Sequence, residues 1–159
     1  MKIAIGADSY GLPLKDSIKK YLASNNYEIQ DFGVNDSSDP TPYYQTADEV
    51  SQRVSRGEFE RAILICGTGM GMSIIANKHP GIYAAVCENT FSAEKSRSIN
   101  NSNVLTLGSM VTTEMIAKDI VEVWLNTQFT EGWEPSIQDW LRNSMDDVSS
   151  LEQKQFANK

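Results

Sequence analysis

The stretch Ala62–Gly71, which reads AILICGTGMG, decides the fold of this 159-residue chain. Its first five residues are uniformly apolar, which is typical of a strand buried on both faces of a parallel sheet. Glycines then stand at alternate positions 67, 69 and 71 and lead into a helical stretch through Asn77. A buried strand that passes through a glycine-rich turn into a helix is the repeating unit of an α/β fold.

The same alternation continues on both sides of this stretch. Four further apolar runs, at 3–6, 27–32, 82–87 and 104–107, read as strands. Helical spacing predicts helices near 13–22, 47–57, 70–77, 91–98, 112–125 and 136–145, with Pro13 in a first turn and Thr90 as an N-cap. Five strands separated by helices predict a three-layer α/β fold around a five-stranded parallel sheet.

Length and charge limit the class of protein. The chain suits one domain, which we assign to residues 1–145, followed by a polar C-terminal tail at 146–159 that we expect to lack regular structure. A formal net charge of -7 argues against a nucleic-acid binder, whose affinity needs a basic surface. No apolar stretch reaches the roughly 20 residues that span a bilayer. Two cysteines and one histidine support neither a disulfide framework nor a histidine-based metal site, so we expect a cytoplasmic protein.

Two loops are the candidate site. Ligands of open parallel sheets lie beyond the carboxyl ends of the strands, where the strand order switches. In the expected order 2-1-3-4-5, the loop Asp8–Gly11 after the first strand neighbours the loop Cys66–Gly71 after the third. We therefore expect these two loops to form one site.

The second loop has the groups needed to move a proton next to a carbonyl. Its glycines let the backbone approach a ligand, and amides that lead into a helix favour negative charge. A Cys66 thiolate could take a proton while the amides hold an enediolate. Two plainer interpretations stay open from spacing alone: the glycines only close a strand-to-helix corner, and Cys66 is a small core residue. Cys87, within an apolar run, reads as core.

The chain resembles a known family along about residues 1–140. The segment Ile65–Ile74 with Ala76–Lys78 is similar to the signature of the ribose-5-phosphate isomerase B family, which includes the galactose-6-phosphate isomerase subunits. Further similarity lies in Ile3–Asp8, Pro80–Ile82, Asn100, Asn103–Leu105 and Gly108–Ser109. The resemblance implies a flavodoxin-like (Rossmann-like) fold and an aldose–ketose isomerase of sugar phosphates, such as those of the pentose phosphate pathway.

The resemblance also implies roles for individual residues. The cysteine that matches Cys66 is the general base, and the threonine that matches Thr68 orients the substrate. Substrate-binding residues are then Asp8, Ser9, Tyr43, the anion-hole residues Gly67, Gly69, Met70 and Gly71, and Asn100 supplied by a neighbouring subunit. The resemblance implies no metal and no organic cofactor, and it implies a dimer or tetramer whose active sites are shared between subunits.

The chain departs from the family pattern at positions that open sugar rings and grip phosphate. A histidine usual after the first strand is Ser9, and the ring-opening histidine is Ile99. Arginines usual near the fifth strand and the C-terminus are absent; the residues at these and related positions are Tyr83, Met110, Trp133 and Ile137. An open-chain tetrulose phosphate needs no ring opening, so it is a candidate substrate beside ribose 5-phosphate. Arg97 is a candidate cation for a partner's site.

Two other functions stay open. The chain could be one subunit of a heteromeric galactose-6-phosphate isomerase, in which site residues are lost from one chain. It could also be a sugar-phosphate binding protein without catalysis, because this architecture hosts many functions. The intact pair of Cys66 and Thr68 favours the isomerase.

Overall fold

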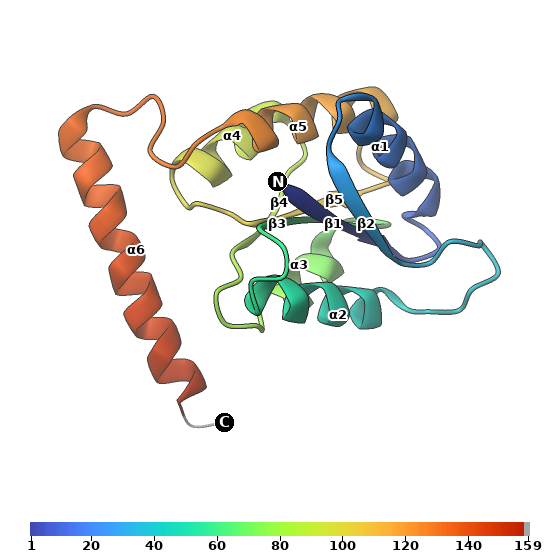
Figure 1. Ribbon diagram of the computed structural model, residues 1–159, viewed down its shortest axis with the longest axis horizontal. Helices are drawn as coiled ribbons and strands as arrows, with labels where there is room; N and C mark the ends of the chain where they lie inside the picture. Colours follow the sequence, from blue (N-terminus) through green and yellow to red (C-terminus); the bar gives the residue numbers. More distant parts are fainter. Residues whose placement is uncertain (158–159) are drawn as a thin grey trace.

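A computed structural model describes residues 1–157 and confirms the three-layer α/β fold (Figure 1). The sheet contains five parallel strands: β1 (Lys2–Ala7), β2 (Glu28–Gly33), β3 (Arg61–Cys66), β4 (Ala84–Val86) and β5 (Val104–Gly108). The helices are α1 (Leu12–Ser24), α2 (Tyr43–Ser55), α3 (Met70–Ala76), α4 (Thr90–Ser98), α5 (Glu114–Asn126) and α6 (Pro135–Phe156).

The strand order is β2-β1-β3-β5-β4, so the predicted order 2-1-3-4-5 is wrong for the last two strands. β5 pairs with β3, and β4 pairs with β5 at the edge of the sheet. Every residue of β5 is buried, as a central strand requires, whereas the residues of the short β4 are half-buried. β1 and β3 remain neighbours, so this correction leaves the two candidate loops side by side.

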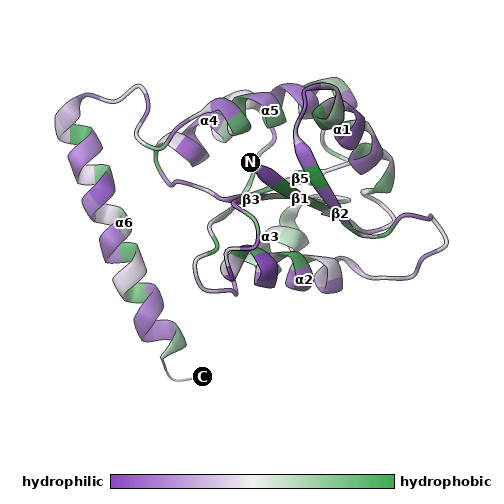
Figure 2. Cartoon of the chain, in the orientation of Figure 1, coloured by the Kyte–Doolittle hydropathy of each residue, from purple (hydrophilic) through white to green (hydrophobic). Residues whose placement is uncertain are grey.

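Side chains of the central strands alternate between two cores. In β3, Ile63 and Ile65 pack in the core that α1 and α5 cover, while Leu64 and Cys66 pack in the core that α2 and α3 cover. Figure 2 shows green on the central strands, whereas the edge strand β2 and the helices carry both green and purple. The burial on both faces explains why residues Ala62–Cys66 of β3 are uniformly apolar.

Two helix starts illustrate what the sequence predicted. Pro13 stands in the first turn of α1, as expected. The predicted cap Thr90 is wrong by one residue: Asn89 caps α4, because its Oδ1 accepts a hydrogen bond from Ser92 N at 2.8 Å. Both Asn and Thr are good capping residues, so adjacent ones are hard to separate from sequence.

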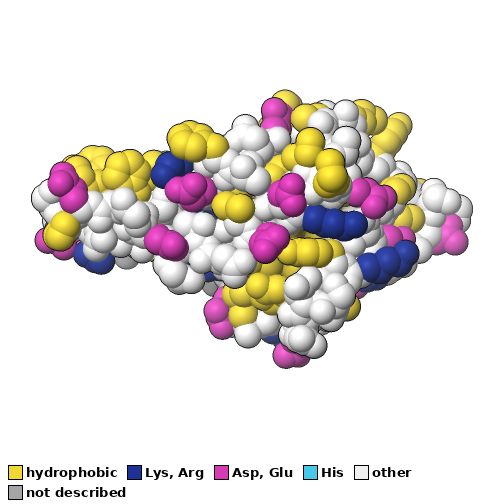
Figure 3. Space-filling model, turned by 90° about the horizontal axis from the view of Figure 1, so that it is seen from above, with side chains coloured by type: hydrophobic (Ala, Val, Ile, Leu, Met, Phe, Trp, Pro, Cys, Tyr) yellow, Lys and Arg dark blue, Asp and Glu magenta, His cyan; other side chains and the backbone are white. Residues whose placement is uncertain are grey.

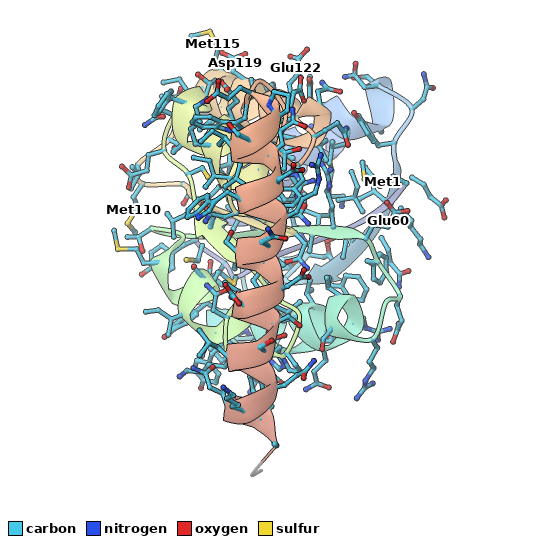
Figure 4. The ribbon with its side chains drawn as sticks, turned by 90° about the vertical axis from the view of Figure 1, so that its left-hand side faces the viewer. Met1, Glu60, Met110, Met115, Asp119 and Glu122 are labelled. Carbon is cyan, nitrogen blue, oxygen red and sulfur yellow. The ribbon has the colours of Figure 1, made fainter. Side chains whose placement is uncertain are left out.

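Helix α6 corrects the expectation of a tail without regular structure. The predicted helix 136–145 continues to Phe156, so residues 146–156 are helical; positions 158–159 lie outside the described residues. An apolar stripe at Leu141, Met145 and Val148 has helical spacing. The helix stands at the side of the domain in Figure 1 and runs in front of it in Figure 4, and only Leu141 of its residues is buried. No helix within residues 1–157 is long and apolar enough to cross a membrane.

Candidate active site

The loops after β1 and β3 meet at the carboxyl edge of the sheet. Asp8 N–H donates to the Ile65 carbonyl at 3.3 Å. A Cβ on Gly11 would lie 2.2 Å from the same carbonyl oxygen, so only glycine permits this approach. The Asp8 carboxylate accepts a hydrogen bond from Gly11 N at 2.9 Å and is buried. These contacts fix Asp8 beside the end of β3.

A pocket of about 390 Å³ opens at this edge of the sheet. Two larger hollows, of about 520 and 440 Å³, lie against the helices; the smaller pocket is the candidate because Cys66 lines it. Six predicted site residues line it: Asp8, Tyr43, Cys66, Gly67, Thr68 and Gly71. The predicted Ser9, Gly69 and Met70 belong to the same loops but are not among the lining residues.

Sequence reasoning missed Tyr10 as a lining residue and noted Met110 only as a departure from a family pattern. Their signal was their position, because both follow the carboxyl end of a central strand. Ser109 Oγ donates to the Tyr10 carbonyl at 2.7 Å, and Met110 N donates to the Gly67 carbonyl at 2.9 Å. The turn after β5 therefore joins both loops and completes the pocket.

Asn100 lies at the amino ends of the strands, whereas the pocket lies at their carboxyl ends. It follows α4 and precedes β5, and nearby Asn103 accepts a hydrogen bond from the amide of Ala62 at the start of β3. Asn100 is exposed there. It therefore cannot join Cys66 within one chain, and a role in the pocket would require a second copy.

Cys66 combines the features of a core residue and of a site residue. It is 6% exposed and packs in the core under α2 and α3, yet it also lines the pocket. Its Sγ accepts a hydrogen bond from Gly69 N at 3.2 Å. A sulfur that is held by an amide and faces a pocket is placed to exchange a proton with a ligand. Cys87, by contrast, is 1% exposed, and burial raises the pKa of its thiol, as the core prediction requires.

Next to the lining residues Cys66 and Thr68, backbone packs directly on backbone. Gly69 has φ +77°, and its Cβ would lie 3.0 Å from the Leu107 carbonyl carbon. A Cβ on Gly108 would lie 2.6 Å from Cα of Thr68. The amides of Gly69 and Met70 donate to the side chains of Cys66 and Thr68, at 3.2 and 3.4 Å. Two of the predicted anion-hole amides therefore hold the two predicted catalytic side chains.

Charge at the pocket is negative. Among the residues that the structure describes, no lysine, arginine or histidine lines it, and Asp8 is its one ionisable carboxyl group. His79 pairs with Asp48 on α2, at 3.0 Å between Nε2 and Oδ1. Arg97 is buried in its own chain, where Nη1 donates to Asn101 Oδ1 and to the Ser102 carbonyl. Burial and nearby Arg61 lower the pKa of Arg97 to about 10. Arg97 is thus held by its own chain, and its role at a partner's site stays a prediction.

Comparison with known proteins identifies the family. The family model described as Ribose/Galactose Isomerase matches residues 3–139. The chain is 45% identical to 4-deoxy-4-sulfo-D-erythrose isomerase of Clostridium sp. (strain MSTE9) over 96% of each chain. It is 39% identical to D-erythrulose-4-phosphate isomerase of Pectobacterium atrosepticum over 83% of this chain and 87% of that one.

A solved structure agrees with this assignment. Ribose-5-phosphate isomerase B of Clostridium thermocellum superimposes with a TM-score of 0.88 at 39% identity, over 98% of this chain and 99% of that one. The family model, the sequence identity and the structural superposition all indicate the same family along nearly the whole length of the chain. The chain is therefore an isomerase that belongs to the ribose/galactose isomerase family.

Proposed function

We propose that the chain interconverts the aldose and ketose forms of an open-chain four-carbon sugar whose C4 carries a phosphate or a sulfonate. The observation that carries this proposal is the pocket itself, where Cys66 and Thr68 lie among lining residues that include no histidine. Two relatives named for four-carbon substrates, one sulfonated and one phosphorylated, support the same substrate class.

The chemistry of the sugar explains why a histidine is dispensable. Ribose 5-phosphate closes into a furanose through its free C4 hydroxyl, and an isomerase must move a proton at the ring oxygen to open it. A four-carbon sugar with its anion at C4 has no such hydroxyl and stays open. The chain has a single histidine, and His79 pairs with Asp48 outside the pocket. The substrate we propose does not need the missing imidazole.

Cys66 is the base in this mechanism. As a thiolate, the sulfur removes the proton from C2 of the aldose, which leaves an enediolate, and then returns this proton to C1 on the same face of the enediolate. In the same reaction the hydroxyl proton moves from O2 to O1, which gives the ketose. Negative charge on the enediolate oxygen is held by the N–H groups of Gly67 and Gly71, as in an oxyanion hole, since those of Gly69 and Met70 donate to Cys66 and Thr68. Thr68 orients the substrate oxygen, and Asp8 accepts hydrogen bonds from its hydroxyl groups.

The charge of the group at C4 distinguishes the phosphorylated from the sulfonated substrate. A phosphate ester carries about −1.5 to −2 charge at pH 7, whereas a sulfonate carries −1. The pocket is lined by the Asp8 carboxyl and by no cationic side chain among the described residues. A single negative charge costs less in such a site, so we rank the sulfonate first.

We also propose self-association into a dimer or tetramer with shared active sites. Asn100 lies at the sheet edge opposite Cys66, so it needs a second copy to reach a pocket. Large apolar side chains stay exposed beside the pocket and along α6: Tyr10, Met70, Ile74, Met110, Trp140, Val148 and Leu151. Figure 3 shows hydrophobic side chains gathered on the projecting end that α6 forms. Two free cysteines fit the cytoplasmic location that we propose.

Turnover by the purified chain tests the function. Three substrates are compared by kcat/KM: sulfo-erythrose, D-erythrulose 4-phosphate and ribose 5-phosphate. We expect both four-carbon sugars to exceed ribose 5-phosphate, with the sulfonate fastest. Cys66→Ser should lower kcat at least 100-fold, because it replaces the base, while the matched variant Cys87→Ser should retain it. Preference for ribose 5-phosphate would refute the substrate class, and activity that survives Cys66→Ser would refute the base.

The same experiment separates the alternatives. Binding of a sugar phosphate without turnover would indicate a non-catalytic binding protein. Turnover that appears only after a second, different chain is added would indicate a heteromeric enzyme. The lack of a cationic side chain at the pocket is the observation that favours these alternatives.

A further inference from the structure

Tyr43 occupies space that a side chain at position 71 would fill. An ideal Cβ on Gly71 would lie 2.6 Å from Cε2 of the tyrosine ring and 3.0 Å from Cδ2 and Cζ. Gly71 lies within α3 and does not have a positive φ, so its backbone conformation does not require glycine. Glycine at this position therefore serves to admit the ring.

The start of α2 holds the ring in this place. Tyr43 is the first residue of α2, after the extended Pro42, and α2 packs beside α3 under the sheet (Figure 1). The Tyr44 ring meets the Tyr43 ring edge-on, with centroids 5.5 Å apart. Tyr43 lines the pocket with Cys66 and Gly71, whereas Tyr44 is not among the lining residues.

A second wall faces the other end of the glycine loop. The Cε and Sδ atoms of Met110 lie 3.3 Å from the place of a Cβ on Gly67. Figure 4 shows Met110 projecting at the side of the molecule. Gly67 and Gly71 are thus covered by Met110 and Tyr43, and the loop that carries Cys66 is open to a ligand between these two side chains.

We infer that Tyr43 is a specificity-determining residue that limits the length of the sugar. This inference rests on the proposed function. The ring is rigid and is wedged against backbone at Gly71, so a longer substrate cannot gain room by pushing it toward α3. Removing the ring opens the space over Gly71, at the C-terminal end of the loop that begins with Cys66. One carbon more or less in a shaped pocket is worth about 10- to 200-fold in discrimination.

Chain-length preference measures this role. We compare kcat/KM for D-erythrulose 4-phosphate and ribulose 5-phosphate in the wild type, Tyr43→Ala, Tyr43→Phe and Tyr44→Ala. Tyr43→Ala should raise the five-carbon to four-carbon ratio at least 10-fold. Tyr43→Phe keeps the ring and should leave the ratio within about twofold, as should Tyr44→Ala. An unchanged ratio in Tyr43→Ala, or an equal shift in Tyr43→Phe, would overturn the inference.

Binding of unreactive analogues separates this inference from the proposed function. Calorimetry with 4-phospho-D-erythronate and 5-phospho-D-ribonate gives the same ratio without turnover. If the wild type binds neither analogue and turns over neither sugar, the proposed function fails and the inference fails with it. If the wild type prefers the four-carbon compound and Tyr43→Ala keeps that preference, the inference alone fails.

A double-mutant cycle tests the placement of the ring without any substrate. Gly71→Ala should lower the unfolding midpoint of the wild type, because the new Cβ meets the ring at 2.6 Å. In the Tyr43→Ala background, the same change should cost little. Additive effects of the two substitutions would show that the ring does not occupy the space over Gly71 and would overturn the inference.

Discussion

Gly69→Ala, compared with Gly57→Ala, gives the sharpest test of the backbone packing beside the pocket. Both glycines have φ +77°. An alanine in this region costs about 1–2 kcal/mol of backbone strain, and it recovers about 0.4–1 kcal/mol by restricting the unfolded chain. These two effects are common to both positions. Only their surroundings differ.

The surroundings set the size of the difference. Nothing lies within 4 Å of a Cβ on Gly57, whereas a Cβ on Gly69 would lie 3.0–3.2 Å from three backbone atoms of Leu107. Backbone of the central strand β5 cannot move aside cheaply, and overpacking of this kind costs about 1–3 kcal/mol. We expect Gly57→Ala to cost about 1 kcal/mol or less and Gly69→Ala about 2–4 kcal/mol.

Activity should fall with the same change. The Gly69 amide donates to Cys66 Sγ at 3.2 Å, so a shift of the loop displaces the proposed base. A misplacement of about 1 Å costs on the order of 100-fold in rate. Urea unfolding and kcat/KM are measured for both variants. Equal free energies of unfolding for Gly57→Ala and Gly69→Ala would refute the steric reasoning, and full activity in a destabilised Gly69→Ala would refute the link to Cys66.

Three further predictions concern stability and assembly. Lys15→Met should lower the free energy of unfolding by about 2–3 kcal/mol, because the buried Lys15 ammonium binds Asp31, Asn35 and the Val34 carbonyl. In urea unfolding, the variant Lys20→Met, at an exposed site, should show almost no loss. Equal losses in the two variants would contradict the prediction. Burial raises the pKa of Cys87 above 9.0, so the unfolded chain ionises first and stability falls as pH rises past about 9. Thermal unfolding between pH 8 and 10 should show a shallower fall in Cys87→Ala, and an unchanged slope would count against it. Leu151→Asp on the exposed face of α6 should shift sedimentation toward monomer, and Gln155→Asp should not; two identical profiles would exclude α6 from the interface.

The sequence predicts most of what depends on local pattern. Uniform apolar runs identified the central strands because both faces of β3 and β5 are buried. The loop from Cys66 to Gly71 was predicted as a site from its glycines, and the structure lines a pocket with it. These are features in which neighbouring residues determine one another's conformation.

What depends on distant contacts was harder to predict. The predicted strand order placed β4 between β3 and β5, whereas β4 lies at the edge of the sheet. The apolar sequence of this strand does not show that its three residues are only half-buried. Arg97 was expected only as a cation for a partner's site, but the carbonyls of Ser102, just after α4, and of the distant Thr127, at the end of α5, accept hydrogen bonds from its buried guanidinium. Tyr10 lies in the predicted loop Asp8–Gly11 but was not named as a site residue, because its residue type gave no chemical signal.

The backbone packing at Gly69 and Gly108 has a consequence for how this enzyme can acquire new substrates. Main chain meets main chain beneath Thr68 and Gly69, so any larger residue at Gly69 or Gly108 displaces the loop that carries the proposed base. Such a surface cannot be reshaped by one substitution at a time. The rim is different, since Tyr10 and Met110 are 65% and 67% exposed and Tyr43 is 38% exposed. Substitutions at these three rim residues can therefore change which substrates fit, while the loop that carries the proposed base keeps its conformation.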